Sequence, residues 1–186
     1  MSTDGVDQIL EQWARERPEL DTQAMGVFGR VARIAAIVND AMEHTYAQHG
    51  ISRADFDVLA TLRRSGEPFQ LSPGALSSAL MLTTGGMTGR LNRLEGAGLV
   101  TRSADLGDRR GLVVTLSDRG RELIDTAVVS GVESLQELLA DIPVGQRSQL
   151  SDLLRDLLAA VTRVAPALPI PHGRPLGEPS RRGRSR

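Results

Sequence analysis

The fold is decided by residues 72–116, which read SPGALSSALMLTTGGMTGRLNRLEGAGLVTRSADLGDRRGLVVTL. Ser72 and Pro73 predict the start of a short helix that ends at Leu80, because Ser caps the first free amides and Pro fits the first helical position. A second helix follows, capped by Thr83 or Thr84 and ending near Gly96 or Gly98. Its apolar positions are Met87, Leu91 and Leu94. Two short helices in this order are typical of a helix-turn-helix, whose second helix enters the major groove of DNA.

Two β-prone runs, 99–102 and 112–116, flank the polar, glycine-bounded turn 105–111. This pattern predicts a β-hairpin with a basic tip. The tip carries Arg109 and Arg110, whose guanidinium groups suit DNA phosphates or the narrow, negative minor groove. The predicted fold class is therefore mainly α with a small β-hairpin wing, a winged helix-turn-helix.

Apolar residues spaced by three and four predict helices on both sides of this region. A short helix at 8–17 stops at Pro18, and a long one spans 21–49. Further helices begin at Ser52 and Ser117, and Pro143 separates the latter from a last helix over 150–161. Apolar stripes at both ends of a small domain need a partner surface, and a twofold homodimer would set two recognition helices about one turn of DNA apart. The predicted division is 1–50 for the N-terminal and dimerisation helices, 51–116 for the winged helix, 117–165 for C-terminal dimerisation helices and 166–186 for a disordered Arg- and Pro-rich tail.

Composition excludes several classes of protein. The chain has no Cys, and its three His (44, 49 and 172) form no metal-ligand pair, so neither a metal nor another cofactor is expected. No apolar run is long enough to span a membrane and no signal peptide is recognisable, so we expect a cytoplasmic protein. Nucleophile elbow, phosphate-loop and dinucleotide motifs are absent, so no catalytic residue is expected and an enzyme is disfavoured.

Charge is unevenly distributed, although the net charge is only −1. All 22 basic residues are Arg, and residues 167–186 hold five Arg against one Glu. The rest of the chain is acidic, which argues against indiscriminate coating of nucleic acid and asks for a local basic surface. The tail is either an electrostatic aid to DNA binding or a solubilising extension.

The candidate DNA-binding residues lie at the helix starts, on the recognition helix and in the wing. They are Ser72, Thr83, Thr84, Thr88, Asn92, Arg93, Asp108, Arg109 and Arg110. Any one of these arginines could merely solvate a surface, and the combination of helix pair and basic hairpin carries the interpretation.

Over residues 8–164 the chain resembles the MarR family of DNA-binding regulators. The resemblance rests on residues 56–62, on Met87-Thr88-Gly89-Arg90-Leu91 with Arg93-Leu94-Glu95, on Gly98-Leu99-Val100 with Arg102, and on Asp108-Arg109-Arg110-Gly111 followed by Leu116-Ser117. It implies that Arg110 enters the minor groove and that Asp108 braces it. Gly89 departs from the family, which usually has a polar residue such as Asn there.

Within this family the chain looks most like the urate-responsive, PecS/HucR-like branch, with its extra N-terminal helix. The ligand residues of that branch map onto Trp13, Asp57, Arg90 and Arg102. Urate is a flat anion near neutral pH, so a stacking ring, planar cationic donors and a carboxylate acceptor suit it. The resemblance implies a dimeric repressor that binds a pseudo-palindromic double-stranded DNA operator and is released by urate or a related purine anion.

Other interpretations of the same residues remain open. Trp13 could be a packing anchor, Asp57 and Arg90 a structural ion pair, and Arg102 a phosphate contact. The ligand could instead be another aromatic acid or a phenol, or the protein could bind DNA without sensing any ligand.

Overall fold

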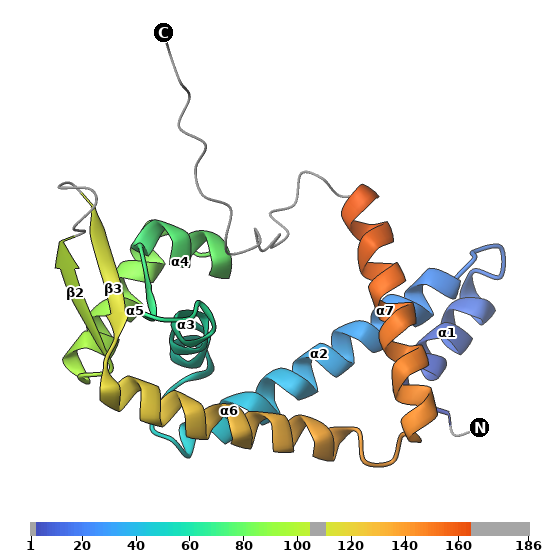
Figure 1. Ribbon diagram of the computed structural model, residues 1–186. Coiled ribbons are helices and arrows are strands. Elements are labelled where there is room, and N and C mark those ends of the chain that lie inside the picture. The colour runs from blue at the N-terminus through green and yellow to red at the C-terminus, as the bar shows by residue number, and fades with distance from the viewer. Residues whose placement is uncertain (1–2, 105–110, 165–186) are drawn as a thin grey trace, which may run out of the picture. The chain divides into compact units, whose positions relative to one another are not determined.

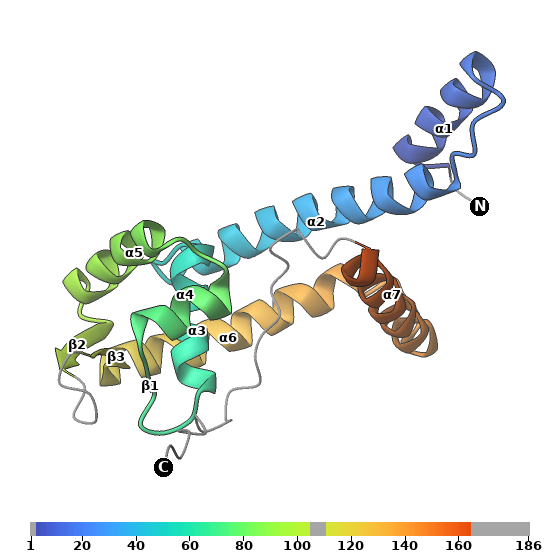
Figure 2. The same ribbon diagram turned by 90° about the horizontal axis from the view of Figure 1, so that it is seen from above.

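A computed structural model of the chain describes residues 3–104 and 111–164. In these residues the helices are α1 (Gly5–Glu16), α2 (Gln23–Ala47), α3 (Arg53–Arg64), α4 (Pro73–Leu80), α5 (Thr84–Gly96), α6 (Asp118–Leu138) and α7 (Val144–Val164). The strands are β1 (Gln70–Leu71), β2 (Val100–Ala104) and β3 (Leu112–Leu116). The chain divides into two compact units, one up to Thr45 and one from Tyr46 onward. Figures 1 and 2 show the elements from two sides.

The N-terminal unit is a hairpin of α1 and the greater part of α2. The Asp4 carboxylate accepts the amides of Val6 and Asp7, which starts α1 three residues earlier than the sequence predicted. Arg30 on α2 pairs with both carboxylates, at 2.8 Å from Asp4 and 2.5 Å from Asp7. The amide of Asp7 and then the guanidinium of Arg30, which both bond to the charged carboxylate, lower the pKa of Asp4 to about 2. Val6 packs against Gly29, so the two helices approach closely.

The second unit has its core where α3, α4, α5 and the sheet meet. Its side chains with less than 2% exposure include Val58, Leu59, Leu62, Leu76, Met87, Leu91, Val100, Val114 and Ile124. These are the apolar positions of the predicted helices and strands, which face one another because burial of apolar surface is the main driving force of folding. Figure 2 shows α4 and α5 side by side, with α3 next to them.

The sheet has three antiparallel strands in the order β1-β3-β2. The predicted hairpin is confirmed, with Arg102 opposite Val114 and Thr101 opposite Thr115. The third strand, β1, was not predicted. It is only two residues long, and its partner residues, Val114 and Thr115, lie far along the chain, so no local pattern marks it.

The predicted helix starts at serine and threonine are confirmed. Ser52, Ser72, Thr83 and Ser117 each accept a backbone amide three residues on. At Ser52 the hydroxyl also donates to the Asp55 carboxylate at 2.7 Å.

Large apolar side chains remain exposed on the long helices of each unit. On α2, Phe28 is 49% exposed and Ile34 and Ile37 are 60% exposed; on α7, Leu153 is 67% exposed. Apolar faces of this kind commonly mark surfaces that contact another protein. Within the described residues, no helix is long and apolar enough to cross a membrane.

Candidate nucleic-acid interface and ligand site

The helix-turn-helix is formed by α4, a three-residue turn and α5. Met81 ends α4 in the left-handed conformation, with φ of 54°. Thr83 then caps α5 through its hydroxyl, which accepts the amide of Gly86 at 3.3 Å. Thr83, Thr88, Asn92 and Arg93 are exposed on or at the start of α5, and Ser72 is exposed at the start of α4. The structure therefore leaves the predicted reading residues of this motif accessible.

Two arginines of α5 reach the first turn of α3. The Nη1 of Arg90 donates to the backbone oxygen of Ala54 at 3.3 Å, and the Nη2 of Arg93 donates to the Oδ1 of Asp55 at 3.1 Å. The side chain of Asp55 is only 13% exposed, whereas that of Arg93 is 60% exposed. The orientation of the recognition helix therefore depends on the first turn of α3.

A third arginine ties the wing to the same helix. Arg102 on β2 donates through Nε to the Glu95 carboxylate at 3.0 Å and through Nη2 to the same carboxylate and to the Asn92 amide oxygen, the latter at 2.8 Å. The hydrogen bond from Arg102 lowers the pKa of Glu95, and the same bond raises the pKa of Arg102. The wing strand and the recognition helix are thus joined by one charged cluster.

Arg53, Arg64 and Arg90 form a cationic cluster whose charges act on Asp57 of α3. Burial raises the pKa of Asp57, while the charges of Arg53, Arg90 and Arg64 oppose that rise. Desolvation also raises the pKa of Tyr46, whose ring stacks on Phe56 with centroids 3.8 Å apart. The charges of three arginines therefore act on one partly buried carboxylate in the second turn of α3.

Of the four predicted ligand residues, Asp57 and Arg90 interact through their charges. Arg90 acts on the charge of Asp57, although its hydrogen bond goes to Ala54. Arg102 instead bonds to Glu95 and Asn92. Trp13 belongs to the N-terminal unit, where it lies on α1 with 40% of its surface exposed. The wing residues Asp108, Arg109 and Arg110, the side chain of Thr84 and the tail 166–186 lie outside the described residues.

Several residues of these clusters were missed from the sequence. Asp55 pairs with Arg93 and Glu95 with Arg102, and the charges of Arg53 and Arg64 act on Asp57. The contacts of Asp55 with Arg93 and of Glu95 with Arg102 join different elements, so spacing along one helix does not reveal them. Arg53 and Arg64 lie four and seven residues from Asp57 on α3, so helical spacing could have indicated them.

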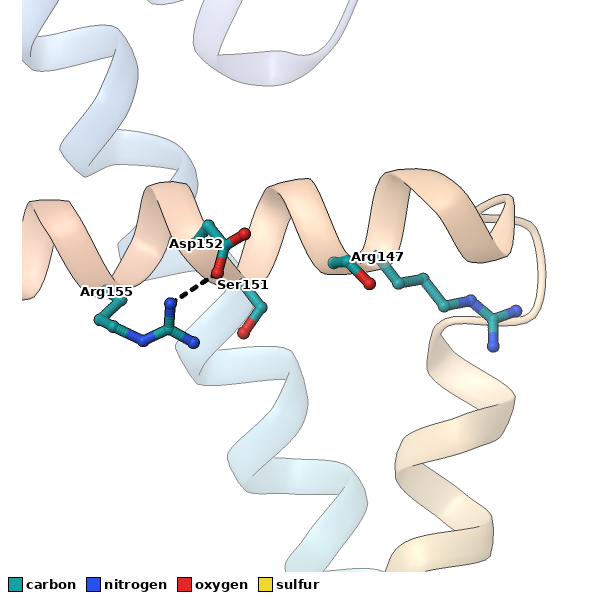
Figure 3. A pocket seen from close by; sticks show the side chains of 5 residues that line it. Arg147, Ser151, Asp152 and Arg155 are labelled. Carbon is teal, nitrogen blue, oxygen red and sulfur yellow. Dashed lines mark hydrogen bonds and ion pairs between the residues drawn. The ribbon is translucent and has the colours of Figure 1, made fainter.

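A hollow of about 340 Å³ lies on α7 (Figure 3). Its lining residues are Arg147, Ser148, Ser151, Asp152 and Arg155. Arg147 donates through Nε to the Ile142 carbonyl at 2.7 Å, and Arg155 pairs with Asp152 at 2.5 Å. The first bond stabilises the turn before α7 and the second lies within α7, so we assign the hollow no role in DNA or ligand binding. Among the described residues no group of His, Asp or Glu is arranged to hold a metal ion.

Comparison with known proteins places these features in context. A model of the MarR family matches residues 49–111. The HTH-type transcriptional regulator PecS of Dickeya dadantii is 37% identical over 149 residues, which is 80% of this chain and 90% of PecS.

Solved structures share the fold at lower identity. Sco3205 of Streptomyces coelicolor, a MarR family transcriptional regulator solved in complex with DNA, aligns with a TM-score of 0.66 and 19% identity over 76% of this chain and 89% of its own. CouR of Rhodococcus jostii RHA1, solved bound to p-coumaroyl-CoA, aligns with a TM-score of 0.61 and 22% identity over 70% of this chain and 90% of its own. These alignments confirm the winged-helix fold predicted from the sequence.

Proposed function

Because the chain belongs to the MarR family of transcriptional regulators, we propose that it represses genes as a homodimer on a pseudo-palindromic operator and leaves the DNA when it binds urate or a related purine anion. The observation that carries the proposal is the junction between α5 and α3. Arg90 belongs to the recognition helix, bonds to Ala54 and acts on the charge of Asp57. One side chain therefore connects the reading helix to the cationic cluster.

In this proposal α5 enters the major groove, and its exposed residues contact the DNA. Thr83, Thr88, Asn92 and Arg93 face solvent on this helix or at its start, with Ser72 at the start of α4. Thr84 and the wing residues Asp108, Arg109 and Arg110 complete the predicted interface. The exposed apolar faces of α2, α6 and α7 supply the dimer surface, since the twofold pairing of such faces sets the spacing of the two reading helices.

The ligand site combines Asp57 and Arg90 with Trp13 and Arg102. The arginines would donate charge-assisted hydrogen bonds to the anion, Asp57 would accept from ring N–H groups, and the indole of Trp13 would stack on the flat ring. The identity to PecS over most of the chain supports the choice of this branch of the family.

Ligand binding would lower DNA affinity by competing for bonds that now orient α5. A purine anion that accepts from Arg90 takes the guanidinium away from Ala54, and one that accepts from Arg102 weakens the contact with Glu95 and Asn92. In this proposal α5 has one arrangement that binds DNA and one that binds the anion, and the anion shifts the balance between them only by its difference in affinity for the two. The coupling is reciprocal, so DNA must also weaken binding of the anion.

A second candidate keeps the regulator and changes the ligand to another aromatic acid or a phenol. The CouR structure, which contains a coumaroyl thioester, gives this alternative a precedent within the same fold. A third candidate is a DNA-binding protein that responds to no ligand at all, for which the cationic cluster around Asp57 would be structural.

The chain offers a direct test, because Trp13 is its only tryptophan. Urate and salicylate are titrated separately into the DNA-free protein while tryptophan fluorescence is followed, with N-acetyltryptophanamide as the control for absorption of light by the ligand. Saturable quenching by urate that is lost in a folded Arg90→Ala variant supports the purine site. Saturable quenching by salicylate alone favours the second candidate, and neither response favours the third.

A further inference from the structure

The contact between Asp55 and Arg93 has no assigned role in the proposed regulator. Asp55 lies in the first turn of α3 and is nearly covered, and its carboxylate accepts from the Ser52 hydroxyl at 2.7 Å and from Arg93 at 3.1 Å. Arg93 projects from the recognition helix with 60% of its side chain exposed. The nearly covered carboxylate of Asp55, which the Ser52 hydroxyl holds in place, thus binds one side of the accessible Arg93 guanidinium.

We propose that Asp55 is a positioning residue for DNA binding, which holds the Arg93 guanidinium so that its remaining N–H groups face a DNA phosphate. A guanidinium carries five donors in a rigid plane, and the contact with Asp55 uses one of its nitrogens. An arginine held in its bound orientation loses less side-chain freedom when it meets the phosphate. This role rests on the proposed contact between Arg93 and DNA.

The charges near the N-terminal end of α3 indicate that Asp55 orients the Arg93 side chain. Arg90 and Arg93 both approach the N-terminal end of α3, where the helix dipole is positive and repels cations. Asp55 lies in that first turn and offsets the repulsion. Without its carboxylate, Arg93 loses the charged partner that the described residues provide against α3, and its side chain samples more rotamers.

The chain contains a matched control for this ion pair. Arg63 on α3 and Asp125 on α6 form another ion pair between helices, at 2.7 Å, with no member on the recognition helix. Asp125→Asn therefore removes the same charge as Asp55→Asn without touching α5, and reports any general gain in DNA affinity from a less acidic protein.

The test is a double-mutant cycle read by fluorescence anisotropy on a duplex from the region upstream of the protein's own gene, at several salt concentrations. Arg93→Ala is expected to weaken binding and to reduce the salt slope by about 0.9, as for the loss of one phosphate contact. Asp55→Asn is expected to weaken binding about three- to tenfold relative to Asp125→Asn, and Arg93→Ala should cost clearly less in the Asp55→Asn background. Asp55→Glu keeps the charge but displaces it, so it should also weaken binding, and circular dichroism verifies that each variant folds.

The two ideas fail differently. If Arg93→Ala leaves both affinity and salt slope unchanged, the proposed DNA contact of Arg93 is wrong, and with it the positioning role. If Arg93→Ala weakens binding but Asp55→Asn and Asp55→Glu do not, only the positioning role is overturned. An increase in affinity in Asp55→Asn beyond that of Asp125→Asn would mean that the carboxylate competes with phosphate, which also overturns it.

Discussion

The Nη1 atom of Arg90 lies 3.3 Å from the carbonyl oxygen of Ala54, which joins the recognition helix to the first turn of α3. The next turn of α3 carries Asp57, whose pKa is raised by burial and lowered by Arg53, Arg90 and Arg64. Any group that changes the charge balance around Asp57 therefore acts on a side chain that belongs to the DNA-reading helix. This relationship underlies the proposed ligand response.

Replacing Asp57 by Asn should stabilise the protein at neutral pH. Burial raises the folded-state pKa of Asp57 above its unfolded value, so the native protein holds this proton more tightly than the unfolded chain does. Asp57 therefore destabilises the protein most at pH values above its raised folded-state pKa. This destabilisation decreases as the pH falls through that pKa, and stays constant once the pH is below the pKa of Asp57 in the unfolded chain. The advantage of the Asn variant in urea denaturation should shrink as the pH is lowered through this window, and a constant advantage would contradict the assignment.

The contact between Arg102 and Glu95 predicts the opposite pH behaviour. The bond to Arg102 lowers the folded-state pKa of Glu95, so its contribution is present above the unfolded pKa and is lost as pH falls through the folded value. Glu95→Gln should alter stability little at neutral pH, because solvent still reaches the partly buried pair, and the difference from wild type should vanish in acid. DNA affinity should fall severalfold because the wing loses its charged link to α5, and unchanged affinity would mean that this link does not set the wing's position.

Gly89 provides a test on the recognition helix itself. A Cβ added at Gly89 would meet no heavy atom within 4 Å, so nothing in the described structure requires glycine there. Gly89→Ala should therefore stabilise the protein by up to about 1 kcal/mol, since glycine is a poor helix former. Differential scanning fluorimetry measures the gain. Gly145→Ala on α7 also meets nothing within 4 Å and is the matched control.

The same pair of variants separates stability from DNA binding. If the glycine of α5 allows the backbone to approach DNA closely, Gly89→Ala weakens operator binding while Gly145→Ala does not. Equal DNA affinity of both variants would show that the backbone of α5 at Gly89 does not approach DNA closely.

Gly131 on α6 is required by the side chain of Tyr46. A Cβ at Gly131 would lie 2.6 Å from the Tyr46 hydroxyl oxygen and 3.1 Å from a ring carbon. Gly131→Ala should therefore destabilise the protein by about 1–3 kcal/mol, typical of overpacking. Tyr46→Phe removes the closest atom and should recover part of the loss in the double variant, as measured by chemical denaturation. Strict additivity of the two changes would argue against this contact.

Local signals account for what could be predicted from the sequence. Ser72 with Pro73, Thr83 and Ser117 mark helix starts through bonds within one turn, and each is found capping as expected. The hairpin was predicted for the same reason, since its two runs flank a polar turn. The strand β1 was missed because its two residues are defined only by pairing with β3.

The partners of the arginines could not be predicted. All 22 basic residues are arginine, and a guanidinium can reach a carboxylate, a carbonyl or an amide oxygen alike. Arg90 was expected at the ligand and donates to Ala54, and Arg102 was expected there and bonds to Glu95 and Asn92. Both contacts join different elements, so they follow from packing and not from spacing along one helix.

The most direct test of the account is the ratio of operator dissociation constants measured by fluorescence anisotropy with and without urate, with salicylate titrated in parallel. The operator probe is a duplex from the region upstream of the protein's own gene. Urate is expected to weaken binding of the wild-type protein, and folded Trp13→Ala is expected to lose this response while it still binds DNA. Arg90→Ala should lose it too where DNA binding survives. Tight, sequence-specific binding that is indifferent to urate would contradict the ligand assignment and leave a MarR-type regulator with another signal or none.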